Sequence, residues 1–153
     1  MKGLGICPVL LAMICMSHPM WGLPENPPSY VGGSQCETCH GDIAKTWQGS
    51  RHAHAMDSLK KSKQENLPAC VKCHVTGFEQ DGGFIDAELT PEMAGVQCEE
   101  CHGPGSAHVS NPAEKPVGAK APGVDLCRKC HTVKQDPGFS YEKKSAEVHG
   151  KKS

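Results

Sequence analysis

The chain has 153 residues and a formal charge of −1, with 16 basic and 17 acidic side chains. Nothing in this charge balance suggests nucleic acid or a membrane surface as the partner. Gly and Pro number 17 and 12, and aromatic residues make up only 5% of the chain, so long regular elements are few. A chain this short and loop-rich cannot easily bury an adequate core from its own side chains.

The N-terminus has the pattern of a secretory signal. Lys2 forms a short positive region, an apolar run covers residues 4–16, and small or breaker residues follow. The run is too short to span a bilayer comfortably. We therefore expect a signal peptide at residues 1–22 and one domain at 23–153, with an uncleaved anchor as the alternative. Export to the periplasm is expected, or to the extracellular space or cell surface, with no membrane span in the mature form.

Eight cysteines lie beyond the signal, and they form four CxxC pairs, each followed immediately by histidine. In chain order these are CETCH (36–40), CVKCH (70–74), CEECH (98–102) and CRKCH (127–131). CxxCH is the attachment signature of c-type haem, because i, i+3 and i+4 share one face of a helical turn. The predicted thioether residues are Cys36, Cys39, Cys70, Cys73, Cys98, Cys101, Cys127 and Cys130, and the predicted iron ligands are His40, His74, His102 and His131.

Other uses of cysteine fit this pattern less well. Structural zinc sites use CxxC pairs but do not require histidine directly after each pair. A thioredoxin-like redox motif is single and sits on a βαβ scaffold, which this sequence does not suggest. Four covalently bound haem c groups, each with its iron, are therefore predicted.

Short helices are expected to carry each CxxCH motif. Ser34 and Glu37 have the spacing of a capping box ahead of the first. Helices are also predicted over 42–48, where Ile43 and Trp47 stand at i and i+4, and over about 53–62. Residues 82–85 are predicted as a brief strand, and 103–123 as a Pro/Gly-rich loop. Glu99 and Glu100, inside the third motif, are expected to face solvent.

Four histidines remain outside the motifs and the signal: His52, His54, His108 and His149. Each can supply a second imidazole to one iron, giving six-coordinate, low-potential electron-transfer centres. His108 follows a glycine-rich turn that brings it beside a neighbouring haem. His52 and His54 would face nearly opposite sides of a helix, so they serve different haems or one is an ordinary surface residue. Met56 and Met93 are the other possible axial ligands, but buried packing is the expected role of each.

The predicted fold is mainly α with much irregular structure, a small multihaem cytochrome c fold wrapped around four closely packed c-type haems. A globule of 131 residues has a radius of gyration of roughly 14 Å. Four macrocycles cannot be isolated from one another in that volume, so electrons can pass from iron to iron. The haems supply the core that the side chains do not.

The chain resembles the tetrahaem cytochrome c-554 family in segments 30–56, 69–78, 94–108, 126–131 and 148–150. GVQCEECHGPGSAH, at 95–108, is the most specific of these. The resemblance implies an exported, mostly helical haem-wrapping fold and electron transfer as the activity. It also implies distal ligands at His52, His108 and His149. Some members of the family have one five-coordinate haem and react with nitrogen oxides.

Three functions follow from this pattern. The leading one is an electron carrier without catalysis of its own, whose partners are redox proteins such as other cytochromes or oxidoreductases. The second is an enzyme acting on a small nitrogen oxide or hydroxylamine at one five-coordinate haem. The third is a self-associating subunit of an extracellular haem filament, in which His149 ligates a neighbour's iron. Binding of carbon monoxide and the oligomeric state distinguish them.

Overall fold

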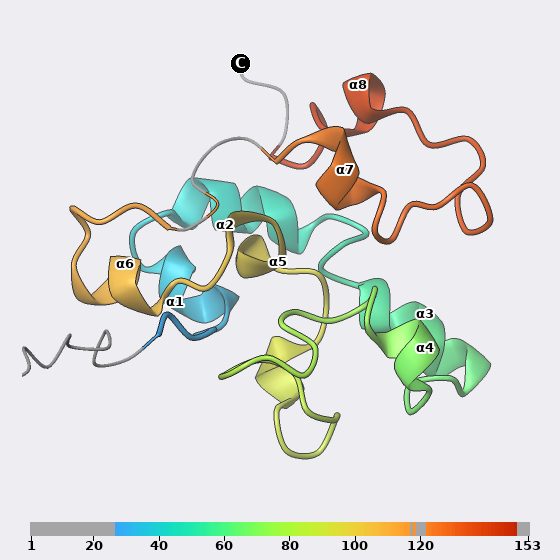
Figure 1. The fold of residues 1–153 in the computed structure, drawn as a ribbon, viewed down its shortest axis with the longest axis horizontal. Helices are drawn as coiled ribbons and strands as arrows, with labels where there is room; N and C mark the ends of the chain where they lie inside the picture. The colour runs from blue at the N-terminus through green and yellow to red at the C-terminus, as the bar shows by residue number, and fades with distance from the viewer. Residues whose placement is uncertain (1–26, 117, 119–121, 150–153) are drawn as a thin grey trace, which may run out of the picture.

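The fold was analysed in a computed structural model, which describes residues 27–116, 118 and 122–149 (Figure 1). The predicted signal peptide lies outside these residues. The described part of the chain is mostly short helices joined by irregular segments, as expected, and it has no strand, only one isolated bridge between Val75 and Ala94. Its helices are α1 (Gly33–Glu37), α2 (Gly41–Gln48), α3 (Ala55–Ser62), α4 (Pro68–Val71), the 3₁₀ helix η1 (Pro91–Met93), α5 (Cys98–His102), α6 (Ser106–Ser110), α7 (Val124–Cys127) and α8 (Tyr141–Lys144).

The two predicted helices between the first and second motifs are confirmed as α2 and α3, and α3 begins two residues later than expected. The predicted strand at 82–85 is wrong. Gly82 adopts φ +73°, a left-handed conformation that turns the chain instead of extending it. The Phe84 N–H still donates to the Thr76 carbonyl, at 3.0 Å, but no ladder of such bonds follows.

A small apolar core lies between α3, α4 and the loop that leads to α5. It consists of Met56, Leu59, Val71, Val75, Phe84 and Met93. The predicted packing role of both methionines is confirmed, because Met56 and Met93 are each only 2% exposed. In Figure 1 the α3–α4 pair stands beside the group formed by α1, α2, α5 and α6, and α1 packs against both α2 and α5.

The start of α1 is held by side chains from a distant segment. The predicted capping box is wrong, because Ser34 lies inside the helix and no side chain of its own segment caps it. The Gly33 N–H donates to Gln97, while the N–H groups of Val31 and Gly32 donate to the Glu99 carboxylate. These contacts satisfy backbone donors that a helix start leaves without intrahelical partners.

The expectation that Glu99 faces solvent is also wrong. Glu99 is 2% exposed, and its carboxylate accepts a third N–H, that of Gly105, at 2.7 Å. A buried carboxylate needs such donors to offset its lost hydration. Glu99 therefore fastens residues 31–32 and the turn before α6 to α5.

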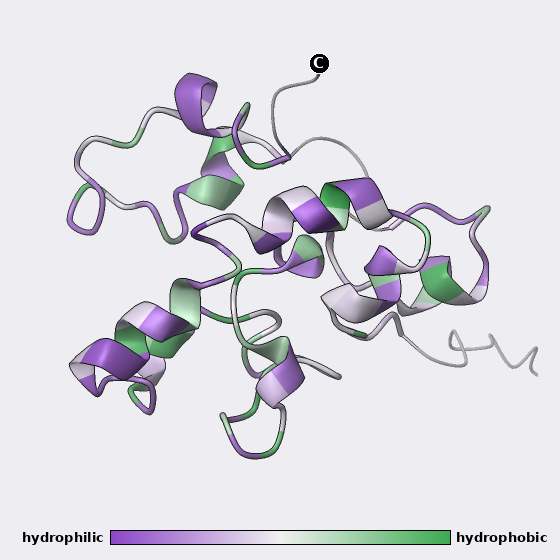
Figure 2. Cartoon of the chain, turned by 180° about the vertical axis from the view of Figure 1, so that it is seen from behind, coloured by the Kyte–Doolittle hydropathy of each residue, from purple (hydrophilic) through white to green (hydrophobic). Residues whose placement is uncertain are grey.

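The C-terminal part of the described chain is built differently. None of the described residues from 106 to 149 is buried, and Val133 is 72% exposed. In Figure 2 α3 carries both hydrophobic and hydrophilic residues, whereas α8 is hydrophilic. Residues 122–149 loop away from the α3–α4 core in Figure 1. None of the described helices is long and apolar enough to cross a membrane.

Candidate haem sites

Each CxxCH motif forms a tight helical turn. The backbone N–H of His40 donates to the Cys36 carbonyl at 2.9 Å, and that of His131 donates to the Cys127 carbonyl at the same distance. This geometry brings both thiols and the imidazole to one face of the turn. The eight thiols are all free of disulfides, as covalent attachment of a porphyrin requires.

Thiols of different motifs lie close together. The Cys36 thiol donates a hydrogen bond to Cys98, which raises the pKa of Cys36 and lowers that of Cys98. Burial raises the pKa of Cys130, and a hydrogen bond with Cys73 raises it further. These contacts join the first motif to the third and the second to the fourth, so the attachment points of the predicted haems are closely packed.

The imidazoles of three motifs each face a second imidazole from a distant segment. His40 and His108 have ring centroids 6.3 Å apart, with planes 24° from parallel. His102 and His149 are 5.8 Å apart at 14°. His52 and His131 are 5.9 Å apart, and their planes cross at 61°.

A spacing of this size fits one metal atom between two imidazoles. A bond from a metal to an imidazole nitrogen is about 2 Å long, and the nitrogen lies about 1 Å from its ring centroid. Two ligands on opposite sides of a metal therefore have centroids about 6 Å apart. Aromatic rings in direct contact have centroids about 4.5–7 Å apart, as in the 4.6 Å separation of His131 and Phe139. The three pairs have the spacing of two ligands on one iron, and each joins a motif to a distant segment.

Hydrogen bonds at Nδ1 leave the other ring nitrogen available in these sites. Nδ1 of His74 lies 2.7 Å from the Ala55 carbonyl, and that of His102 lies 3.3 Å from the Gly118 carbonyl. Nδ1 of His108 bonds to the Glu114 carbonyl. A carbonyl only accepts, so Nδ1 carries the proton and the Nε2 lone pair is free for a metal.

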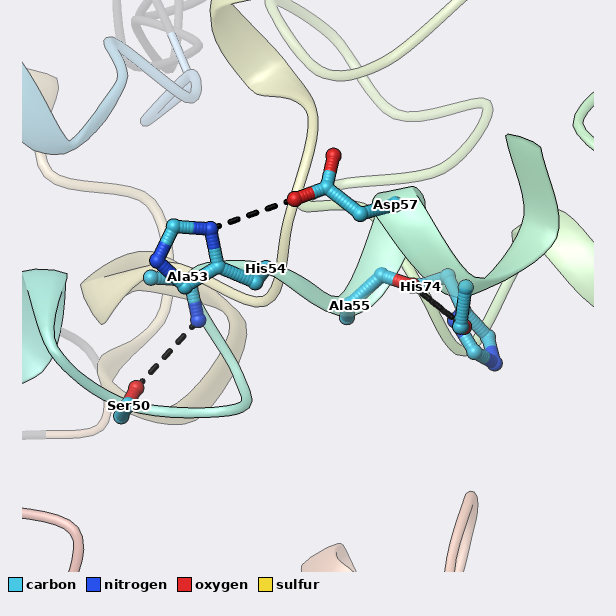
Figure 3. Close-up of polar contacts among 7 residues, drawn as sticks. Ser50, Ala53, His54, Ala55, Asp57 and His74 are labelled. Atoms are coloured by element: carbon cyan, nitrogen blue, oxygen red, sulfur yellow. Dashed lines mark hydrogen bonds and ion pairs between the residues drawn. The ribbon is translucent and has the colours of Figure 1, made fainter. Parts of the chain in front are cut away.

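The second motif differs from the other three. Among the described residues, no second imidazole faces His74. Its Nδ1 is hydrogen-bonded to the Ala55 carbonyl and lies 3.3 Å from the Ser58 hydroxyl. His54, predicted as a ligand, has its Nδ1 3.2 Å from Asp57 and its side chain 64% exposed. Figure 3 shows the two imidazoles on either side of Ala55, with the His54 ring turned to Asp57.

The paired histidines differ in exposure: His40 and His149 are exposed, and the other four are half-buried. Burial lowers the pKa of His52, and the neighbouring His131 lowers it further. Burial likewise lowers the pKa of His149, with His102 adding to the effect. Both shifts favour the neutral imidazole, which is the form that binds metal. A small, largely apolar cavity lies beside the pair His102–His149. It is lined by Ile43, Trp47, His52, Val96, Gln97, Cys98, Cys101, His102, Val148 and His149.

Comparison with known proteins points to one family. Residues 35–103 match the family described as cytochrome c554 and c-prime, and residues 91–136 match the doubled CXXCH motif. Cytochrome c-554 of Nitrosomonas europaea is 36% identical over 140 residues, which cover 78% of this chain and 57% of that protein. The solved structure of its reduced state aligns with a TM-score of 0.59 at 26% identity, covering 82% of this chain and 86% of that one.

The chain belongs to the cytochrome c554 family. This cytochrome is a multihaem c-type protein that binds haem c covalently, and its four motifs fit the four haems predicted above. It is also 28% identical over 116 residues to the multiheme cytochrome MtrA of Shewanella baltica, covering 72% of this chain and 31% of that protein. The chain thus spans 57% and 31% of the lengths of these two relatives.

Sequence reasoning missed the groups that orient the imidazoles. Asp136, whose Oδ2 lies 2.8 Å from Nδ1 of His131, follows that ligand by five residues and was not singled out. An acidic residue shortly after a CxxCH histidine is visible in the sequence, so Asp136 could have been identified from its position. The carbonyls of Ala55, Gly118 and Glu114 offer no such signal, because every residue has one.

Proposed function

We propose that this cytochrome carries electrons between redox proteins through four closely spaced haems. The observation that carries the proposal is the set of three imidazole pairs at 5.8–6.3 Å. Two strong ligands on an iron leave no position for a substrate, so such sites exchange electrons and do not bind reactants. No acid–base residue is required for this activity.

The proposed ligand sets follow the pairs. His40 and His108 bind the iron of the CETCH haem, His102 and His149 that of the CEECH haem, and His131 and His52 that of the CRKCH haem. Every pair joins a motif to another segment of the chain, so ligation also fixes the tertiary structure. The eight motif cysteines provide the thioethers.

Haem supplies reversible one-electron chemistry at its iron. The residues of this chain orient the group and exclude water from it. The cavity residues Ile43, Trp47 and Val96 offer an apolar wall beside His102, and a low-dielectric surrounding would favour the neutral ferrous core over the cationic ferric one. The bonds at Nδ1 hold the imidazoles of His74, His102, His108 and His131 in one tautomer.

A second candidate function belongs to the CVKCH haem alone. Because no second imidazole among the described residues faces His74, its iron has an open position for a small ligand such as nitric oxide or hydroxylamine. His54 as its sixth ligand is the alternative. We propose the open position, since the His54 ring is engaged with Asp57.

The optical spectrum of the reduced holoprotein, recorded before and after adding carbon monoxide, tests these assignments. We expect a Soret shift worth one haem in four, unchanged in the His54→Ala variant. A shift worth more than one haem would contradict the paired ligation. No shift in the wild type, with one appearing in His54→Ala, would make His54 the sixth ligand.

Electron transfer and catalysis are separated by two further measurements. A carrier shows four reversible one-electron steps in a potentiometric titration and no turnover of hydroxylamine or nitric oxide with a chemical electron donor or acceptor. Turnover that is abolished by carbon monoxide would move the activity to the CVKCH haem.

Export to the periplasm is proposed from the N-terminal pattern. Haem c is attached to CxxCH motifs outside the cytoplasm in bacteria, which agrees with a secretory signal at 1–22. Mass spectrometry of the purified holoprotein should find an N-terminus near residue 23 and four added haems. A chain that retains Met1 would show that the segment is an anchor.

A further inference from the structure

The imidazoles of this cytochrome differ in the group that accepts their Nδ1 proton. For His74, His102 and His108 the acceptor is a neutral backbone carbonyl. For His131 it is the carboxylate of Asp136, at 2.8 Å. Among the hydrogen bonds of the described residues, this is the one that joins a proposed iron ligand to a charged acceptor.

We propose that Asp136 is a positioning residue that gives the CRKCH haem the lowest reduction potential of the three haems with paired imidazoles. The inference rests on the proposed ligation of that iron by His131 and His52. It adds an order of reduction potentials among the haems, which the ligand sets alone do not provide.

The direction follows from charge. A carboxylate draws the Nδ1 proton more strongly than a carbonyl does, so the imidazole becomes a more electron-rich ligand. Such a ligand stabilises ferric over ferrous iron. Reduction adds one electron to the iron, breaks no bond and leaves the Nδ1 proton between His131 and Asp136. The CRKCH haem is then the last of the three to be reduced and the first to lose its electron.

The surroundings of His131 keep this hydrogen bond in place. The Phe139 ring stacks on the His131 imidazole, with centroids 4.6 Å apart and planes 20° from parallel. The Arg128 guanidinium lies 5.7 Å from the Phe139 centroid and covers that ring. Asp136 is 41% exposed, so water screens its long-range field, but not the direct bond to Nδ1.

The orientation of the ligands gives this haem a spectroscopic label. The His52 and His131 planes cross at 61°, whereas the other two pairs are within 24° of parallel. Crossed imidazole planes give a low-spin ferric haem an electron paramagnetic resonance signal at larger g than near-parallel planes do. A redox titration followed by this resonance therefore tracks the CRKCH haem separately.

The experiment compares holoprotein variants in that titration. In Asp136→Asn we expect the equilibrium constant for reducing the CRKCH haem to rise about tenfold, which corresponds to about 59 mV for one electron. Asp125→Asn is the matched control, because it removes the same charge from the same segment. Asp125 is exposed, lies two residues before Cys127 and does not contact an imidazole. Asp136→Glu keeps a carboxylate and should remain near the wild-type potential.

Three results would overturn the inference. In the first, Asp136→Asn and Asp125→Asn shift the potential equally, and in the second, the large-g haem of the wild type is not the lowest of the three. In the third, Asp136→Glu shifts the potential as much as Asp136→Asn. The ligation itself is tested by His52→Ala, which should abolish the large-g signal. If that signal persists in His52→Ala, the proposed ligand set fails, and this inference fails with it.

Discussion

Six apolar side chains pack between α3, α4 and the loop leading to α5, whereas none of the described residues from 106 to 149 is buried. Residues 56–93, here called the packed region, thus have an interior made of their own side chains. Residues 122–149, here called the haem-held region, have none. What orders the second region is proposed to be the CRKCH haem, through two thioethers and the His131 ligand.

This difference shows how one short chain can use two kinds of core. Burying a Leu, Met or Phe side chain contributes roughly 1.5–3 kcal/mol, so the packed region gains stability before any cofactor is added. The haem-held region has few such gains to offset the conformational entropy of its backbone. Its order should therefore depend on attachment of the cofactor.

The largest expected effect comes from removing one haem. In the double variant Cys127→Ala, Cys130→Ala, the haem-held region should lose nearly all hydrogen-exchange protection, while the packed region keeps its own. Exchange followed by mass spectrometry measures both in one sample. The matched control is Cys70→Ala with Cys73→Ala, where α4 should stay protected because Val71 is 3% exposed and packs in the core. Equal losses in the two variants would erase the distinction between the regions.

Truncating a side chain at the centre of the packed region should lower stability without loss of haem. Phe84 is 2% exposed, and Phe84→Ala should lower the free energy of unfolding by about 3–5 kcal/mol, since it removes buried surface and leaves a cavity. Denaturant unfolding measures this, and the haem content should not change. Ile85→Ala is the control, because Ile85 is 62% exposed and should cost within about 0.5 kcal/mol.

Glu99 fastens residues 31–32 and the turn before α6 to α5, outside both regions, and should show an intermediate effect. Glu99→Gln replaces one carboxylate oxygen by an amide NH2 that cannot accept, so the N–H of either Gly32 or Gly105 loses its acceptor, while the remaining oxygen still accepts from Val31. The expected cost is about 1–3 kcal/mol in the free energy of unfolding. Glu88→Gln, on an exposed side chain, should be silent. A silent Glu99→Gln would mean that water replaces the lost acceptor.

The smallest predicted effect compares a hydrogen bond between α2 and the segment before α5 with one inside the haem-held region. Nε1 of Trp47 donates to the Val96 carbonyl at 2.8 Å, and the Tyr141 hydroxyl donates to the Pro122 carbonyl at 2.7 Å. Trp47→Phe should lower the free energy of unfolding by about 1 kcal/mol. Tyr141→Phe should change only the local exchange rates of the haem-held region. A global effect of Tyr141→Phe would show that the two regions unfold together.

The sequence was most informative where chemistry requires fixed spacing. The four CxxCH motifs, their helical turns and the helices predicted over 42–48 and about 53–62 follow from patterns of i, i+3 and i+4, and the structure has these helices at 41–48 and 55–62. The packing of Met56 and Met93 and the scarcity of a side-chain core were also predictable. These features depend on local pattern and composition, which a sequence contains directly.

What the sequence did not reveal depends on contacts across the chain. Glu99 looks like a surface residue in its motif, and only the approach of residues 31, 32 and 105 explains its burial. The same approach replaced the predicted capping box at Ser34. Gly82 turned a predicted strand because its φ is set by the tertiary fold. The pairing of imidazoles is likewise a property of three dimensions, since each pair joins distant segments.

The hydrogen bonds of residues 29–33 also constrain the order of events when the protein is made. Ser29 and Tyr30 donate to Ser106 and Asp81, while residues 31–33 donate to Gln97 and Glu99. The segment just ahead of the CETCH motif is synthesised early, yet its acceptors appear some 50 to 77 residues later. Closing such long loops is slow. The segment ahead of the first motif therefore cannot form its contacts to Gln97 and Glu99 until the third motif has been synthesised.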